Sequence, residues 1–590
     1  MSVPERWRST TTLLIFAAVF ITLTVSSYTR ESATWDEPQH VVTGYSALRF
    51  HDYRTDPEHP PFIRMWAALP LLAMDNVKVD LQRIDAVDPV VWAGGDQFFF
   101  CHEMLYVAND ADHLLYQARF MVVLLGVLLG VLLFCWTREL FGFWPAMIVL
   151  GLYTIEPNLL AHARLVTTDF GVTCFIFGTL YFLWRTTRRL TPANVGGLLG
   201  FFVLAQISKF SALLLGPIVL ALLLARVCQK APWPASLGRR AAVDGRLQKL
   251  AVALGFVVAL ALATWVAIWA VYDFRYLPSD TPAWRWSFHE DPGILQRTPL
   301  LTKAVTWIDE HQLLPNAYSE GFLLGQVKAQ KRSGFLAGSY SINGWWYFFP
   351  LAFLIKTPIS LILLLLAGLV LAAVRWRRFL DQNIYVLLPL FTFLATAMMM
   401  KLNIGVRHIL PIQPFVLLLA GTAIAELYAS HRRPFRLLLG AACLVAVVEF
   451  ALICPHYLAF FNQFVGGPRN GHNYLVDSNL DWGQDLKGLK GWMDGHGVSH
   501  INLSYFGTAD PAYYNIDCTY LPGGPFFTDR LVKSPDLPGY VAVSVTNLRG
   551  VYFAESSRLI YHKLLLAKPV AIIGYSIYVY RLQAPGGSRP

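Results

Sequence analysis

Long apolar runs recur along most of the chain and set its hydrophobic pattern. Each run is close to the ~20 residues that an α-helix needs to cross a ~30 Å hydrocarbon core. The pattern therefore predicts an all-α polytopic membrane domain over residues 1–455, with about eleven transmembrane helices. The runs lie at roughly 11–28, 117–136, 143–160, 168–184, 194–207, 210–227, 250–271, 350–373, 383–400, 408–428 and 436–455.

The loops between the runs divide into two kinds by charge. With the N-terminus inside, every inside loop is basic and holds almost no acid, which is the pattern of the positive-inside rule. This threading puts loops 29–116 and 272–349 and the tail 456–590 on the outer side. The basic residues of the inside loops are Arg6, Arg8, Arg138, Arg185, Arg188, Arg189, Lys230, Arg239, Arg240, Arg246, Lys249, Arg375, Arg377, Arg378, Arg432, Arg433 and Arg436.

The hydrophobic pattern changes after residue 455. Strand-like runs at 500–506, 540–546 and 569–581 are separated by turns rich in Gly, Pro and Asp, and 482–494 has a helical pattern. We expect a small α/β domain over 456–590 on the outer face. The shorter patches 65–74 and 345–349 are too short to span and are typical of segments lying at the membrane interface.

Composition supports a membrane protein. Hydrophobic residues make up 55% of the chain, and the formal net charge is +10. Because the basic residues cluster in short loops between apolar runs, we expect no nucleic-acid partner. The cysteines show no metal-type spacing; Cys101 and Cys518 fall in polar segments, and whether they pair stays open. The short basic segment Met1–Arg8 precedes a run without a cleavage pattern, which favours a retained first helix.

Candidate chemistry begins with the adjacent acids Asp36 and Glu37, directly after the first apolar run. Charges this close to hydrocarbon are costly to place without a purpose. A carboxylate there can act as a general base or bind a divalent cation. The alternative is a solvated loop that only ends a helix. A second acid, Asp169, follows Arg164 in RLVTTD, at an expected outer turn; its alternative role is to cap the next helix.

Cationic residues also occur on the predicted outer side. His59 and Arg64 flank a rigid Pro-Pro pair in EHPPFIR, Lys209 interrupts two apolar runs, and Arg407 and His408 make an outer loop basic against the charge rule. An arginine at this position is well suited to bind a phosphate, because its planar guanidinium can donate hydrogen bonds to two phosphate oxygens at once. The alternatives are an interfacial loop and a snorkelling lysine. The segment VDSNLDWGQDL at 476–486 could bind a sugar or shape the docking of the tail.

The sequence has neither of the two common nucleotide-binding motifs, the P-loop and the dinucleotide-binding fingerprint, and it has no serine nucleophile elbow of the hydrolase type. An outer enzyme that joins groups therefore needs an activated donor carried in the lipid. Outer carboxylates and cations fit transfer from a lipid phosphate, because an acid can activate the acceptor while cations hold the phosphate.

Three segments occur in order along the chain: WDE at 35–37, EHPPFIR at 58–64 and ARLVTTD at 163–169. Over roughly residues 1–455 the chain resembles the polytopic glycosyltransferases that use polyprenyl-phosphate sugars, whose fold is called GT-C. This group includes the protein O-mannosyltransferases and the lipid A aminoarabinose transferases. The tail, with LVDSNLDWGQDLKGL, is similar to that of many bacterial members, so the resemblance implies a bacterial inner or plasma membrane.

The resemblance also implies roles for single residues. Asp36 falls at the position of the proposed general base, Glu37 completes the pair, and His59 and Arg64 fall near the donor phosphate. In the mannosyltransferases a lysine stands where Arg64 stands here. The aminoarabinose transferases carry Glu-Lys-Pro-Pro at this place and bind a metal in that region, which implies a divalent metal ion near Glu58.

These observations favour an inverting membrane glycosyltransferase with an extracytoplasmic active site. Its donor would be a polyprenyl-phosphate sugar, and its acceptor a hydroxyl of a protein, lipid or glycan. One alternative is a lipid or solute transporter, which predicts ionisable residues at the membrane midplane and halves of matching pattern. Another is a non-catalytic scaffold, which leaves the acid pair and the basic outer loops without a role.

Overall fold

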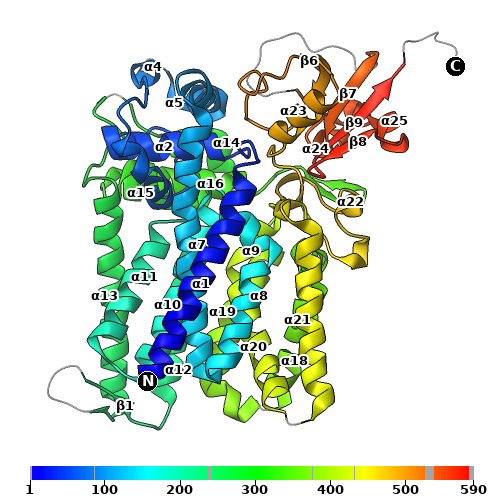
Figure 1. Ribbon diagram of the computed structural model, residues 1–590. Coiled ribbons are helices and arrows are strands. Elements are labelled where there is room, and N and C mark those ends of the chain that lie inside the picture. The colour runs from blue at the N-terminus through cyan, green and yellow to red at the C-terminus, as the bar shows by residue number, and fades with distance from the viewer. Residues whose placement is uncertain are drawn as a thin grey trace.

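The fold is mostly helical, with long helices running side by side and a cap at one end (Figure 1). The computed structural model describes residues 3–85, 87–236, 242–282, 284–374, 376–430, 432–524 and 537–583. The N-terminus lies at the end away from the cap. The long helices are α1 (Val3–Tyr28), α7 (Ala111–Phe141), α8 (Phe143–Ile155), α10 (Thr168–Arg188), α11 (Pro192–Gln206), α12 (Leu215–Cys228), α13 (Arg246–Val271), α18 (Ile359–Val374), α19 (Trp376–Met399), α20 (Gln413–Ala429) and α21 (Arg433–Ile453).

Every apolar run expected to span contains a helix. By length and composition, six helices of the described chain can cross a membrane, or seven if one bent pair counts as a span. This confirms the membrane-type helical class, while the expected number of about eleven spans stays a prediction. None of the seven cysteines forms a disulfide, so Cys101 and Cys518 are not bonded to each other.

Two expected spans are broken where a proline interrupts helical hydrogen bonding. The run 350–373 consists of α17 (Phe348–Lys356) and α18, which meet at 116° across Pro358. The run 143–160 divides into α8 and α9 (Pro157–His162), because Glu156 caps α9 by accepting a hydrogen bond from Leu159 N at 2.6 Å. Proline fits the first turn of a helix, where no internal N–H partner is needed.

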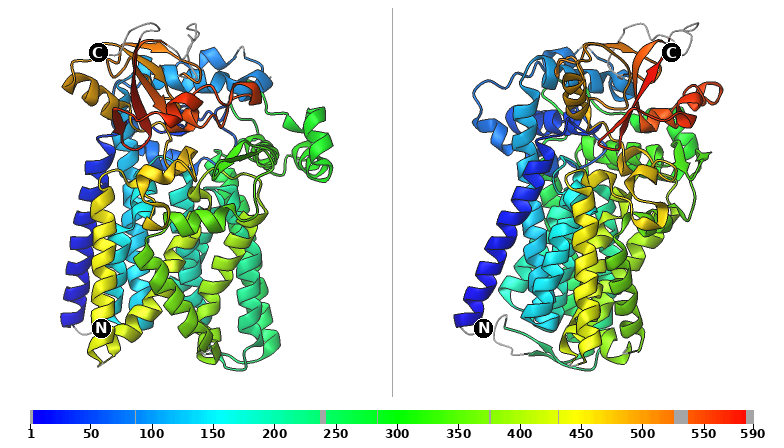
Figure 2. Two further views of the ribbon diagram at one scale, coloured as in Figure 1. Left: turned by 90° about the vertical axis from the view of Figure 1, so that its right-hand side faces the viewer. Right: turned by 45° about the vertical axis from the view of Figure 1, so that its right-hand side comes forward.

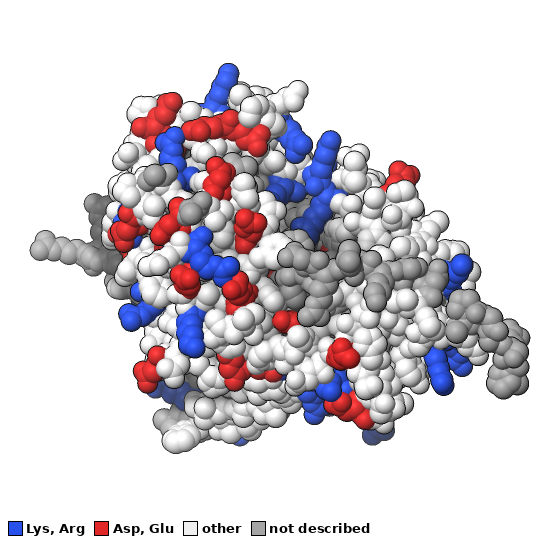
Figure 3. Space-filling view, turned by 90° about the horizontal axis from the view of Figure 1, so that it is seen from above, with Lys and Arg blue, Asp and Glu red and all other residues white. Residues whose placement is uncertain are grey.

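Loops 29–116 and 272–349, which the sequence predicts to be the first and second outer loops, fold into short helices that cap the bundle. The first contributes α2 (Glu37–Phe50), α3 (Phe62–Ala68) and α6 (Gln97–His102). The second contributes α14 (Pro292–Arg297), α15 (Pro299–Glu310) and α16 (Asn316–Lys328), followed by a hairpin of β3 (Gly334–Leu336) and β4 (Ser339–Ser341). Seen from above, this end of the molecule carries many charged side chains of both signs (Figure 3).

The tail forms the small α/β domain that the sequence predicts. Its five-stranded sheet has the order β6-β5-β7-β9-β8. β5 pairs in parallel with β6 and β7, whereas β9 pairs antiparallel with β7 and β8. The expected strand 569–581 divides in two because Gly574 and Tyr575 adopt left-handed turn conformations. The elements are β5 (Ile501–Ser504), β6 (Cys518–Tyr520), β7 (Gly539–Ser544), β8 (Ala571–Ile573), β9 (Ile577–Leu582) and α23 (Leu486–Gly495).

The C-terminal domain sits on the same end of the bundle as the outer loops (Figure 2). Backbone hydrogen bonds join it to the segment before α2: Ser32 N donates to Gln484 O and Trp35 N to Trp482 O, both at 2.9 Å. The Thr508 hydroxyl donates to Trp35 O at 2.8 Å. The C-terminal domain is therefore hydrogen-bonded to the segment that leads into Asp36.

Candidate active site

Four charged side chains from distant segments meet beneath the cap. Asp36 lies at the start of α2, and Asp169 lies in the first turn of α10. Lys209 immediately precedes the short helix η4 (Phe210–Leu214), and Arg407 lies in the 3-10 helix η6 (Val406–Ile412). The sequence predicted all four for one site, and the structure brings them together.

Arg407 lies at the centre of this cluster. Its Nη1 donates to Asp36 Oδ2 at 2.6 Å and lies 3.7 Å from Asp169 Oδ2. Lys209 Nζ donates to Asp169 Oδ1 at 2.5 Å. The result is an alternating row of acids and cations, Asp36–Arg407–Asp169–Lys209. Lys209 therefore forms an ion pair with an acid and does not extend toward the membrane surface. Asp169 is not the N-cap of α10, because Thr167 occupies that position, and its carboxylate pairs with cations instead.

Burial differs along the row. The side chains of Asp169 and Arg407 are 4% and 11% exposed, whereas the side chain of Asp36 is 26% exposed and is the more accessible of the two carboxylates. Burial by itself would raise the pKa of Asp36, but the Arg407 guanidinium outweighs it, so the pKa lies below its ordinary value. Asp36 is consequently charged at neutral pH, as a general base must be.

Several polar atoms around the row have no hydrogen-bond partner among the described residues. They are Arg407 Nε, His408 Nε2 and His59 Nδ1, all buried. Burial and the nearby Lys209 lower the pKa of His59 well below its ordinary value, so this imidazole is neutral. Buried polar groups are rarely left unsatisfied in folded proteins. Their convergence here is the arrangement expected of a site that receives a polar ligand.

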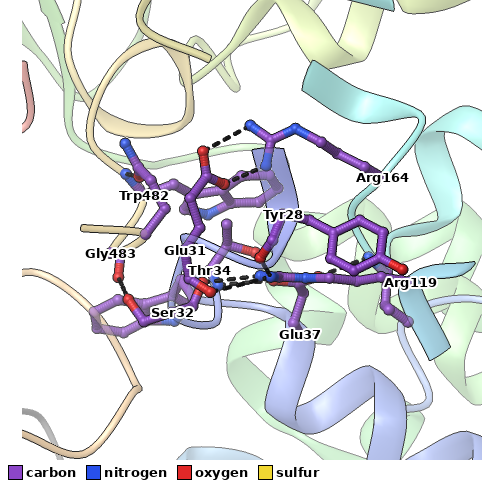
Figure 4. Close-up of polar contacts among 12 residues, drawn as sticks. Tyr28, Glu31, Ser32, Thr34, Glu37, Arg119, Arg164, Trp482 and Gly483 are labelled. Carbon is purple, nitrogen blue, oxygen red and sulfur yellow. Dashed lines mark hydrogen bonds and ion pairs between the residues drawn. The ribbon is translucent and has the colours of Figure 1, made fainter. Parts of the chain in front are cut away.

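Glu37 and Arg164, both expected near substrate, instead lie in a buried polar network with Arg119 and Glu31 (Figure 4). Glu37 Oε2 accepts from Arg119 Nη2 at 2.6 Å, and Glu37 Oε1 accepts from Val166 N at 2.9 Å. Arg164 pairs with Glu31. Both Glu37 and Arg164 are fully buried, so they brace the first loop against α7 and α10. The residue that sequence reasoning missed is Arg119, although an arginine inside an apolar run was a signal.

Two further expected residues also lie in ion pairs. Arg64 is 1% exposed, and its Nη1 donates to Asp56 Oδ2 at 2.6 Å. It thereby locks the loop that carries His59. Glu58, expected near a metal, accepts from Lys328 Nζ at 2.5 Å and is partly exposed.

The tail contributes Trp482, which sequence reasoning placed in a segment of uncertain role. The Arg407 guanidinium carbon lies 4.2 Å from the centre of the Trp482 ring, within cation–π range. Trp482 is almost fully buried. The segment 476–486 thus contacts the site through the Trp482 ring, which packs against Arg407.

A separate group of possible metal ligands lies in the second outer loop. The group consists of His289, Asp309 and Glu320. Each residue offers one possible ligand atom, and the three atoms lie within 4.8 Å of one another.

A family comparison bears on the region that holds two members of the row. Residues 111–269 match the family described as dolichyl-phosphate-mannose-protein mannosyltransferase. The matched segment includes Asp169 and Lys209. Over this segment the match confirms the resemblance to the protein O-mannosyltransferases that the sequence motifs indicate. No curated protein matches the chain.

Among solved structures, the chain is similar to ArnT from Cupriavidus metallidurans bound to undecaprenyl phosphate. The two sequences are 13% identical, the alignment covers 96% of this chain and 97% of that chain, and the TM-score is 0.38. The apo oligosaccharyltransferase of Archaeoglobus fulgidus has 13% identity, coverages of 95% and 73%, and a TM-score of 0.43. The same organism's AglB with an inhibitory peptide and a dolichol-phosphate has 11% identity, coverages of 92% and 70%, and a TM-score of 0.41. At these TM-scores we assign no function from overall shape.

Proposed function

We propose that the chain is an integral-membrane glycosyltransferase that moves a sugar from a polyprenyl-phosphate donor to an extracytoplasmic acceptor hydroxyl, with inversion. The observation that carries the proposal is the row Asp36–Arg407–Asp169–Lys209, with one partly open carboxylate beside buried cations. The family match over residues 111–269 supports the donor class.

Asp36 acts as the general base. It takes the proton of the acceptor hydroxyl while the hydroxyl oxygen attacks the anomeric carbon, and the bond from that carbon to the phosphate oxygen breaks. The electron pair leaves with polyprenyl phosphate. One displacement inverts the anomeric centre. A positioned base contributes ~10²–10⁴-fold to such a step.

Arg407 and Lys209 hold the leaving phosphate, and Asp169 holds both cations in place. Arg407 Nε, His408 Nε2 and His59 are the nearby polar groups that supply further contacts to phosphate oxygens. In this role Asp169 is a positioning residue, because both cations contact it. Charge-assisted contacts of this kind favour the departing phosphate as its negative charge grows.

Release of the lipid phosphate tests the proposal. The full-length protein in nanodiscs would receive polyprenyl-phosphate mannose and polyprenyl-phosphate glucose, each with labelled sugar, together with a hydroxyl-rich acceptor panel of Ser/Thr peptides, glycosides and lipids. We expect release of polyprenyl phosphate that depends on an acceptor, and a loss of ~10²–10⁴-fold in Asp36→Asn.

Asp280→Asn is the matched control, because this outer-loop carboxylate is 92% exposed and lies outside the row. It should release polyprenyl phosphate at the parent rate. If the protein bound the lipid-linked sugar and moved it across the membrane without breaking its bond to phosphate, the transporter alternative would be favoured. An Asp36→Asn protein that binds donor and turns over within a few-fold of the parent would rule out Asp36 as the base.

A further inference from the structure

His289, Asp309 and Glu320 converge from three elements of the second outer loop. His289 lies in the short helix η5 (Phe288–Glu290), Asp309 near the end of α15, and Glu320 in α16. His289 Nδ1 is hydrogen-bonded to Glu320 Oε1, and a carboxylate oxygen of Asp309 lies within 4.8 Å of both ligand groups. None of the three belongs to the row around Arg407, so the proposed transfer reaction leaves them without a role.

The charge of this group is unbalanced for its burial. Glu320 is 0% and Asp309 5% exposed. Among the described residues, neither carboxylate forms an ion pair with a lysine or arginine, and His289 is the one basic partner of Glu320. Two buried carboxylates therefore face a single imidazole. Buried charges in proteins are paired or coordinate metals.

Outer hydrogen bonds already orient the two carboxylates. Asn316 Nδ2 donates to Asp309 Oδ1 at 3.0 Å, and Asn316 Oδ1 is itself fixed by Trp286 N at 2.9 Å. His289 N donates to Glu320 Oε2 at 3.2 Å. Metal-binding carboxylates are usually held by such a second layer of hydrogen bonds. This layer distinguishes the group from a chance collection of surface acids.

We propose that His289, Asp309 and Glu320 bind one divalent ion of the zinc or manganese class. One imidazole nitrogen with two carboxylates suits these ions better than magnesium or calcium, which prefer oxygen ligands alone.

The ion would stiffen the segment next to the site without touching substrate. It joins η5, α15 and α16, and the far end of α16 carries Lys328, which pairs with Glu58. Midway along α16, Gly321 packs so closely on Pro57 that an added Cβ would lie 1.8 Å from Pro57 O. The metal therefore supports the loop that carries His59, in place of direct coordination by Glu58.

Metal binding by the full-length protein tests this inference without any donor. The protein would be stripped with a chelator, returned to chelator-free buffer, and titrated with ZnCl₂ and MnCl₂ by calorimetry, with MgCl₂ for comparison. We expect one ion per chain for zinc or manganese, and a loss of at least ~100-fold in affinity for Glu320→Gln. The thermal midpoint should rise with metal in the parent protein and stay constant in Glu320→Gln.

Glu310→Gln is the matched control, since Glu310 is adjacent to Asp309 in sequence but its side chain is exposed. It should bind metal like the parent. His289→Gln provides a second disabling variant should Glu320→Gln fail to fold. No stoichiometric ion, or equal affinity in the Glu320→Gln and parent proteins, would overturn the inference and identify a proton-sharing network instead. Because no donor is present, this result is independent of whether sugar transfer is observed.

Discussion

At the scale of single residues, the proposed mechanism predicts that the cation beside Asp36 sets the acid limit of activity. The Arg407 guanidinium keeps the pKa of Asp36 low although burial opposes it. The base is charged above that pKa, and activity disappears as the pH falls through it. We therefore expect the acid limb of the kcat/KM profile to lie below the range of an ordinary Asp, about pH 4.

Arg407→Gln makes this prediction specific. The variant removes the cation but leaves the burial of Asp36, so the acid limb should move to higher pH even though the overall rate falls. The measurement is the pH dependence of polyprenyl phosphate release. An unchanged acid limb would show that another group sets the profile.

Four charged residues that the sequence assigns to one site do lie together in the structure, while their roles in catalysis stay predictions. Asp36, Asp169, Lys209 and Arg407 were predicted because charges at membrane ends are costly, and the structure joins them. The sequence could not predict which ion-pair partner each charged residue has. Glu37 and Asp36 are neighbours with equal charge, yet Glu37 pairs with Arg119, and only the packing of α7 against the first loop decides this.

At the scale of elements, the tail contacts Arg407 through one indole ring. Trp482 lies under Arg407 at 4.2 Å, and its backbone oxygen accepts a hydrogen bond from Trp35 N. Trp482→Leu removes the ring, and a cation–π contact is worth about 0.5–2 kcal/mol. We expect a drop of about 2–30-fold in the release of polyprenyl phosphate, mainly in kcat.

Trp482→Phe is the comparison for this loss, because it keeps an aromatic face and should recover much of the rate. Limited proteolysis of both variants checks that the tail stays folded. Equal rates for Leu and Phe at this position would mean that the ring does not position Arg407.

Elements were predicted well in type and less well in continuity. The apolar runs, the helix of 482–494 and the strands of the tail all appear. The runs 350–373 and 569–581 were each read as one element, and each is two. Hydrophobicity does not report a bend, since Pro358 and Gly574 stand between segments that are equally apolar on both sides.

At the scale of the whole molecule, loop charge predicts which end faces which compartment. Basic loops lie at the end with the N-terminus, and the rule for positive charges places that end inside. Figure 1 shows β1 (Trp233–Pro234) at this end and α22 (Pro468–Gly471) toward the capped end. The row around Arg407 lies beneath the cap, so the direction of insertion decides whether the site meets extracytoplasmic acceptors.

Reporter fusions after residues 235 and 470 measure that direction. We expect the fusion at 235 to be active only as a cytoplasmic reporter and the fusion at 470 only as an extracytoplasmic one. Both points lie outside the long helices, so an insertion there leaves the apolar segments intact. Two fusions on the same side would contradict the threading. The opposite assignment, with 470 inside, would place Asp36 and its cations in the cytoplasm, where nucleotide-activated donors are available and the case for a lipid-linked donor fails.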